Sequence, residues 1–113
     1  MELTTTQSGD LQVVKVKEAR IDAAVAIQFK DAVRASTEGG APRIVLDLSQ
    51  VAFIDSSGLG AIVAAMKQMR DGQKLDLAGL TPAVDKVFRL TRMDTVFAIY
   101  ASVDAAMLEK TGT

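Results

Sequence analysis

Residues 43–48 read Arg43-Ile44-Val45-Leu46-Asp47-Leu48, a nearly continuous run of β-branched and aliphatic side chains. Such a run is typical of a central strand that helices cover on at least one face. The chain then passes through Val51–Ile54 into Asp55-Ser56-Ser57-Gly58, where three residues of capping type precede a glycine. A helix is predicted to begin here, because the apolar residues that follow recur at helical spacing: Leu59, Ile62, Val63, Met66 and Met69.

Strand and helix patterns also alternate on the amino-terminal side of this unit. Two strands are predicted over Glu2–Gln7 and Leu11–Glu18, with Ser8-Gly9-Asp10 as the turn between them. A helix over residues 23–37 is predicted next, with Asp22 as its N-cap. The domain is therefore expected to open with a hairpin and a helix.

The same alternation continues on the carboxyl-terminal side. Lys74–Ala78 is predicted to be a strand, and the following helix is expected to have Thr81 as its N-cap and Pro82 at its first position. Val96–Tyr100 has the pattern of a last strand, and a short helix capped by Ser102 precedes the polar end at 110–113. The order ββαβαβαβα predicts one α/β domain over residues 1–113, with helices packed against a mixed, mostly parallel sheet.

The composition limits the possible functions. Thirteen Lys and Arg against 14 Asp and Glu give a net charge of −1, and the scattered basic residues argue against a nucleic-acid partner. Cysteine and histidine are absent, which excludes disulfides, Cys- or His-ligated zinc and imidazole-activated nucleophiles within this sequence. We find neither an apolar run long enough to cross a bilayer nor a signal-peptide pattern. These features predict a soluble, cytoplasmic protein with no cofactor, no metal and no direct membrane contact.

The turn at residues 55–58 is the most informative part of the sequence for function. It places the hydroxyls of Ser56 and Ser57 at a strand-to-helix junction, where free backbone N–H groups and the helix dipole can hold an anion. Gly58 and Gly60 each lower helix stability by about 1 kcal/mol relative to alanine, which indicates close approach of a backbone or a partner.

A helical wheel places small and polar residues opposite the apolar stripe: Gly60, Ala61, Ala64, Lys67 and Gln68. This smooth face would let another protein dock beside Ser56, with a phosphate of about −1.5 to −2 charges as the switch. Asp55 would add like charge. The residues alone leave another interpretation open, in which Asp55 or Ser56 only caps the helix, Asp22 is only an N-cap, and the small residues only pack.

The chain resembles the STAS family of anti-sigma factor antagonists over nearly its whole length. The similarity is carried by Ile44–Leu48, Val51–Gly60, Leu80–Val84 and Leu90–Asp94. Asp22 falls where the family has an acidic residue near its phosphorylation site. The family often has a glycine at the position of Arg92, and another within the stretch that here reads Glu18-Ala19-Arg20.

The resemblance implies a partner-switching protein that is not an enzyme. In the family, the serine directly after the motif's aspartate, here Ser56, is phosphorylated by an anti-sigma factor with serine kinase activity. The unphosphorylated antagonist binds that anti-sigma factor and frees the sigma factor, and a PP2C-type phosphatase restores it. The residues expected at the partner interface are Asp22, Asp55, Ser56, Ser57, Gly58, Gly60, Ala61 and Ala64.

Other classes of function fit the sequence less well. A nucleophilic Ser56 would have no histidine to activate it, and the turn lacks the first glycine of a nucleophile elbow. A dinucleotide fingerprint would need its third glycine at Val63, and a P-loop lysine is missing. The alternative that stays open is a STAS scaffold or accessory subunit of a signalling or membrane-transport complex, in which Ser56 is never phosphorylated.

Overall fold

The middle of the structure is the apolar strand β4 (Arg43–Asp47), all of whose residues are buried. The computed structural model describes residues 1–109, so the polar end at 110–113 lies outside the described residues. On one side of β4 lies the antiparallel hairpin of β1 (Leu3–Ser8) and β2 (Leu11–Val16). The apolar run therefore occupies the central position that the sequence predicted.

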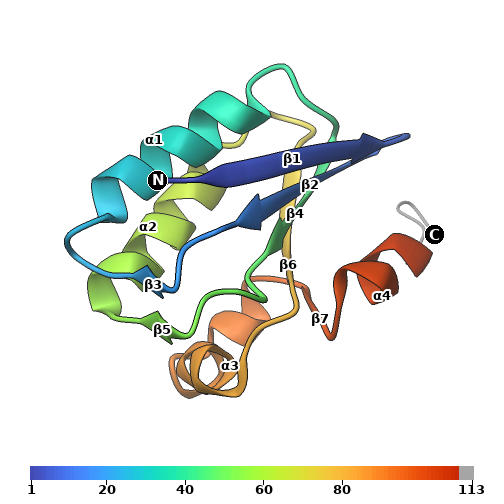
Figure 1. Cartoon of the computed structure of the whole chain (residues 1–113). Coiled ribbons are helices and arrows are strands. Elements are labelled where there is room, and N and C mark those ends of the chain that lie inside the picture. Colours follow the sequence, from blue (N-terminus) through green and yellow to red (C-terminus); the bar gives the residue numbers. More distant parts are fainter. Residues whose placement is uncertain (110–113) are drawn as a thin grey trace.

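Two further strands complete the sheet on the other side of β4. β6 (Lys74–Ala78) pairs with β4, and β7 (Ile99–Tyr100) pairs with β6. The order is β1-β2-β4-β6-β7, and only the β1–β2 pair is antiparallel (Figure 1). The predicted mixed, mostly parallel sheet is confirmed, although the last strand is shorter than Val96–Tyr100.

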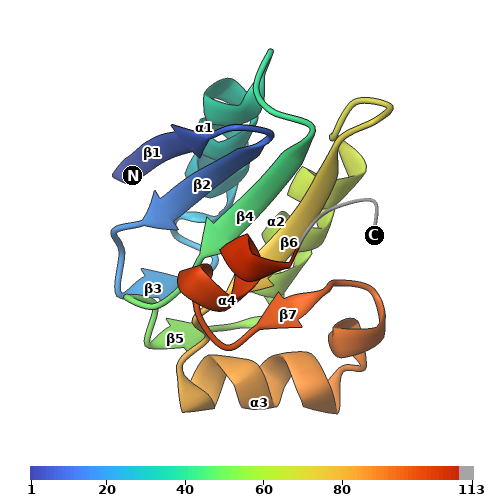
Figure 2. The same ribbon diagram turned by 90° about the vertical axis from the view of Figure 1, so that its right-hand side faces the viewer.

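Helices cover the sheet unequally. α1 (Ala26–Thr37) and α2 (Ser56–Lys67) lie together on one face, and α4 (Val103–Leu108) crosses the other face (Figures 1 and 2). α3 (Pro82–Leu90) and the 3₁₀ turn η1 (Met93–Thr95) lie beyond the carboxyl ends of β4 and β6 (Figure 2). Within residues 1–109, no helix has the length and apolar character that crossing a bilayer requires.

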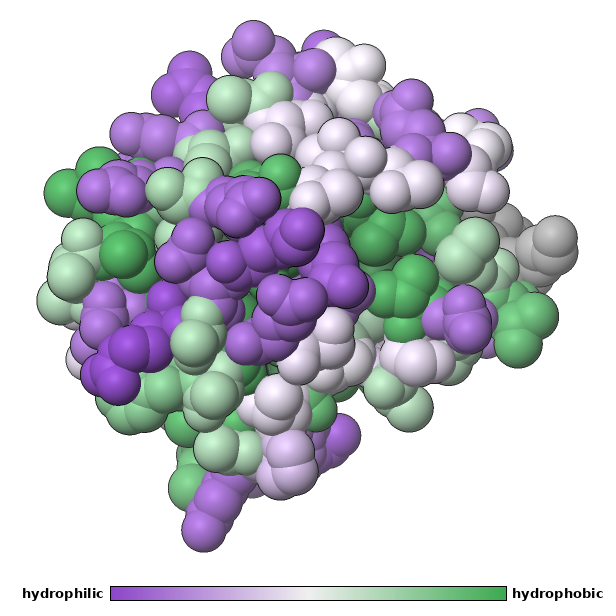
Figure 3. Space-filling view, viewed as in Figure 1, coloured by the Kyte–Doolittle hydropathy of each residue, from purple (hydrophilic) through white to green (hydrophobic). Residues whose placement is uncertain are grey.

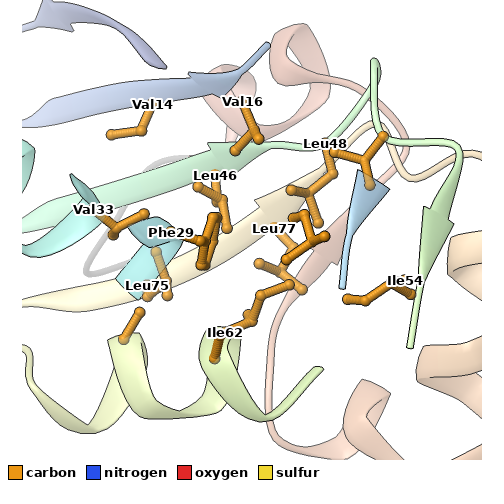
Figure 4. Packing of buried hydrophobic residues seen from close by; sticks show 14 of the residues in the cluster. Val14, Val16, Phe29, Val33, Leu46, Leu48, Ile54, Ile62, Leu75 and Leu77 are labelled. Atoms are coloured by element: carbon orange, nitrogen blue, oxygen red, sulfur yellow. The ribbon is translucent and has the colours of Figure 1, made fainter. Parts of the chain in front are cut away.

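The main core lies between the sheet and the pair formed by α1 and α2 (Figure 4). Phe29 and Val33 enter it from α1, and Ile62 enters it from α2. Each such side chain contributes roughly 1.5–3 kcal/mol by burial. The sheet residues that face these helices are Val14, Val16, Ile44, Leu46, Leu75 and Leu77.

A buried ion pair fastens α4 to the opposite face of the sheet. Arg43 Nε lies 3.0 Å from Asp76 Oδ2, and both side chains are almost fully buried. Arg43 Nη1 also donates to the carbonyl oxygens of Ala106 at 2.9 Å and Glu109 at 2.8 Å, at the end of α4. The arginine fork thus joins β4, β6 and the last helix, where loss of one partner would leave a buried charge.

One position departs from what its sequence pattern suggested. The prediction that Asp22 is the N-cap of a helix starting at residue 23 is wrong, because α1 begins at Ala26 and its N-cap, Val25, makes no side-chain cap. Asp22 instead stabilises the preceding turn, with its Oδ1 accepting from the N–H of Ala24 at 3.1 Å. Arg92 has a positive φ of 64°, a conformation that glycine adopts without strain, which agrees with the glycine that the resemblance leads one to expect there.

Candidate functional site

The candidate site is built on two very short strands that the sequence did not predict. β3 (Arg20–Ile21) and β5 (Phe53–Ile54) pair in parallel as a separate two-stranded sheet. Each strand ends in isoleucine followed by aspartate, and Ile21 pairs with Ile54. The turn before α1 and the start of α2 therefore lie side by side at one end of the molecule (Figure 1).

Asp55 joins these two segments through one carboxylate. Its Oδ1 accepts a hydrogen bond from the N–H of Gly58 at 2.8 Å, so Asp55 is the N-cap of α2. Its Oδ2 accepts from the N–H of Ala23 at 3.2 Å, in the turn before α1. The sequence left open whether Asp55 or Ser56 caps the helix, and the structure shows that Asp55 does. The bond to Ala23 depends on the unpredicted β3–β5 pair.

Ser56 and Ser57 are the first two residues of α2, and both are exposed. Because Asp55 supplies the cap, the Ser56 hydroxyl is not needed for capping. The first turn of a helix presents backbone N–H groups without intrahelical acceptors, and the positive end of the dipole lies there. A negative group on Ser56 is therefore compatible with this end of α2.

The two glycines of this helix meet different surroundings. A Cβ at Gly58 would lie 1.9 Å from the carbonyl oxygen of Ile21, so the backbone of β3 fills the space that a side chain would need. A Cβ at Gly60 would meet nothing within 4 Å. Gly58 is thus required by the fold itself, whereas the fold gives no steric reason for glycine at position 60.

The remaining small residues of α2 divide between the interior and the surface. Ala61 is only 7% exposed and packs in the core, so its predicted place on the outward face is wrong. α2 contacts α1 as well as the short strands, which widens its buried arc beyond the apolar stripe. Ala64 is half-buried and Gly60 is exposed, so these two, with the serines, form the accessible part of the predicted interface on α2.

Charges gather beside the exposed serines. The half-buried carboxylates of Asp22 and Asp55 each accept a backbone N–H from the turn before α1. Arg20 Nε lies 3.2 Å from Asp22 Oδ2, and the Arg20 guanidinium carbon lies 4.5 Å from the centre of the Phe53 ring. Within residues 1–109, no three acidic, histidine or cysteine side chains are grouped closely enough to hold a metal ion.

Sequence reasoning missed two exposed apolar side chains at this end of the molecule. Phe53 on β5 is 42% exposed, and Ile27 in the first turn of α1 is 72% exposed. Ile27 lies off the buried stripe of Ala26, Phe29 and Val33, so its outward direction could have been read from helical spacing. The exposure of Phe53 could not be predicted in this way, because β5 is too short to show an alternating pattern.

Comparison with known proteins shows where this architecture belongs. The family model described as STAS domain matches residues 2–106. The chain belongs to the STAS domain family.

Its relatives in this family carry consistent names. The chain is 31% identical over 103 residues to BtrV of Bordetella bronchiseptica, whose name describes an anti-sigma factor antagonist, and the match covers 90% of this chain and 89% of BtrV. It is 32% identical to the anti-sigma-B factor antagonist of Listeria monocytogenes over 70% of each chain. The crystal structure of an anti-sigma factor antagonist from Mycobacterium paratuberculosis superposes with a TM-score of 0.83 at 26% identity, over 95% of this chain and 91% of that one.

The two glycines of α2 provide a matched pair of substitutions. Gly58→Ala forces the Ile21 carbonyl away and is expected to lower the free energy of unfolding by about 1–3 kcal/mol or more. Gly60→Ala meets open space and is expected to raise it by up to about 1 kcal/mol through helix propensity. Urea denaturation followed by circular dichroism measures both. Equal stability of the Gly58→Ala and wild-type proteins would contradict the close approach at Ile21.

Proposed function

We propose that this STAS domain, residues 1–113, is an anti-sigma factor antagonist controlled by phosphorylation of Ser56. Its unphosphorylated form binds an anti-sigma factor with serine kinase activity and releases the sigma factor, and phosphorylation of Ser56 ends that binding. The observation that carries the proposal is an exposed serine at the start of α2 whose capping role is already filled by Asp55. The names of the relatives support the same role.

The position of Ser56 suits a kinase substrate. Its hydroxyl is exposed and lies at a helix end held by the Asp55 bonds to Gly58 and Ala23. A phosphate there carries about −1.5 to −2 charges and is favoured by the helix dipole. Phosphorylation would therefore leave the fold intact and alter the surface that the partner meets.

Like charge provides the means of switching. Asp22 and Asp55 already place two carboxylates at the junction beside the serines. A phosphate of about −1.5 to −2 charges nearly doubles the negative charge of these two carboxylates, and a partner that docks closely must remove water from all three groups. Binding that is favourable with the two hydrogen-bonded carboxylates would then be weakened by charge repulsion and by the cost of desolvating the phosphate.

The surface around Ser56 has the features of a contact patch. Gly60 leaves open space on the exposed side of α2, and Ala64 continues that low surface one turn later. Ile27 and Phe53 add large exposed apolar groups from neighbouring elements. An interface commonly derives most of its binding energy from a few such apolar anchors, with small residues allowing close approach.

The chemistry of the cycle belongs to other proteins. The kinase transfers the phosphate, and a PP2C-type phosphatase removes it, so the antagonist itself needs neither a cofactor nor a catalytic group. This cycle operates in the cytoplasm, where sigma factors act, without direct contact of the antagonist with nucleic acid or membrane. Asp22, Asp55, Ser57 and Gly58 serve by shaping the surface on which Ser56 is presented.

Charge at Ser56 is the first property to test. Ser56→Asp is expected to weaken binding to the kinase-type anti-sigma factor about tenfold or more, because a like charge at a close interface costs more than about 1.4 kcal/mol. Ser56→Ala should bind as wild type does and resist phosphorylation. Ser57→Ala, the matched control, should bind and remain a substrate. Isothermal titration calorimetry measures the affinities.

Two outcomes, one of this titration and one of a phosphorylation assay on the same variants, would count against the proposal. Unchanged affinity for both Ser56→Asp and Ser56→Ala would contradict the charge switch. Phosphorylation of Ser56→Ala but not of Ser57→Ala by the purified kinase would move the phosphorylation site to the neighbouring serine.

The apolar anchors can be tested with two equally exposed residues. Ile27 and Leu90 are 72% and 73% exposed, but Leu90 lies at the end of α3. Ile27→Ser is expected to weaken partner binding roughly 5- to 30-fold, as loss of an interface anchor of about 1–2 kcal/mol would. Leu90→Ser should leave it unchanged. Equal losses for both variants in the same titration would argue against a patch centred on Ser56.

A further inference from the structure

β1 is an exposed edge strand of the main sheet. It is the first strand in the order β1-β2-β4-β6-β7, and no other element lies beyond it (Figure 2). Its sequence, Leu3-Thr4-Thr5-Thr6-Gln7-Ser8, contains no charge and no proline, and five of its six residues are exposed. Edge strands usually carry charges, prolines or bulges, or are very short, because these features prevent pairing with another chain. The register with β2 is continuous over all six residues, so β1 has no bulge either.

The register of the hairpin fixes which backbone groups of β1 are free. Leu3 stands opposite Val16 and Ser8 opposite Leu11, and the N–H of Lys17 donates to the carbonyl of Glu2 at 3.0 Å. Hydrogen-bonded and non-hydrogen-bonded pairs alternate along an antiparallel ladder. The even-numbered residues of β1 therefore bond to β2, and the N–H and C=O groups of Leu3, Thr5 and Gln7 point away from the sheet.

We propose that a second copy of this chain pairs with β1 in an antiparallel arrangement, with Thr5 on the twofold axis. In this register Thr5 faces Thr5 of the second copy, and Leu3 faces Gln7 of the second copy. The outward-facing backbone groups of all three residues in each copy then form hydrogen bonds to the other copy. A shift of the register by two residues in either direction would leave some of them unpaired. The two sheets would join into one continuous sheet of ten strands.

The side chains at this contact are self-complementary. Thr4 would lie opposite Thr6 of the second copy at the close spacing of a non-hydrogen-bonded pair, and threonine pairs of this kind are favourable. No charged residue of β1 meets its own copy, so a twofold contact brings no like charges together. A second copy of this uncharged strand is thus a suitable occupant of the edge.

An apolar groove continues the contact on the face that carries α4. Thr4, Thr6 and Ser8 line it together with the apolar Val13, Val103 and Met107 and the charged Lys15 and Asp47. Figure 3 shows this hydrophobic area between β1 and α4. In the twofold arrangement the grooves of the two copies adjoin along β1. The inference stands apart from the proposed function, because β1 contributes none of the residues at the Ser56 junction.

Proline at position 5 is a sharp test, because the N–H that it removes points away from β2. Sedimentation velocity of the wild-type protein is expected to show a concentration-dependent rise from 12.0 kDa towards twice that mass. Thr5→Pro should remain monomeric with an unchanged far-ultraviolet circular dichroism spectrum, since proline is tolerated on edge strands. Thr5→Val keeps the N–H and should still dimerise. A wild-type protein that is monomeric up to millimolar concentration would overturn the proposal.

Cysteine cross-linking tests the register, because the chain contains no cysteine of its own. Facing residues in a hydrogen-bonded pair have Cα atoms about 5.5 Å apart, within the range that a disulfide spans. Thr5→Cys should therefore cross-link under mild oxidation much faster than Ala83→Cys, an exposed control on α3. Equal rates would contradict a twofold axis at Thr5. Amide protection of β1 that arises only on adding the anti-sigma factor would overturn self-pairing in favour of a partner strand.

Discussion

The site depends on one close approach, in which the carbonyl of Ile21 occupies the space that a side chain at position 58 would need. That contact brings the end of β3 against the first turn of α2, and the Asp55 carboxylate then bonds to both segments. The start of α2 is consequently held by a segment more than thirty residues earlier in the chain. Ser56 therefore lies on a helix end that these contacts hold in place.

At the start of α2, residues that stabilise the fold and residues that are exposed to solvent lie within a few positions of one another. Asp55 satisfies the helix N-terminus and Gly58 admits the neighbouring backbone, so both serve the fold. Ser56 and Gly60 have no comparable task, and both face solvent. The helix dipole accommodates negative charge at this position. A modification of Ser56 can therefore change what a partner meets while the core between the sheet and α1 and α2 stays the same.

The sequence predicts the large elements well because their patterns are long enough to be periodic. β4 and the start of α2 follow from the apolar run and the capping residues around Asp55. β3 and β5 have two residues each, which is too short for a periodic pattern to predict them. Because β3 was not predicted, the role of Asp22 in the turn after β3 was not predicted either. Ala61 was misplaced because a helical wheel assumes one buried face, whereas α2 packs on two sides. The sequence could not show that Gly58 lies against the Ile21 carbonyl whereas Gly60 faces open space, because that difference depends on residues distant in the sequence.

The most direct test of the central claim is peptide mass spectrometry of the protein isolated from its own cells with phosphatase inhibitors, with and without stress. The account predicts a phosphate on Ser56, none on Ser57, and an occupancy that changes with the condition. Unmodified Ser56 under every condition would contradict the switch and favour a constitutive scaffold, even though the family and the fold would stand.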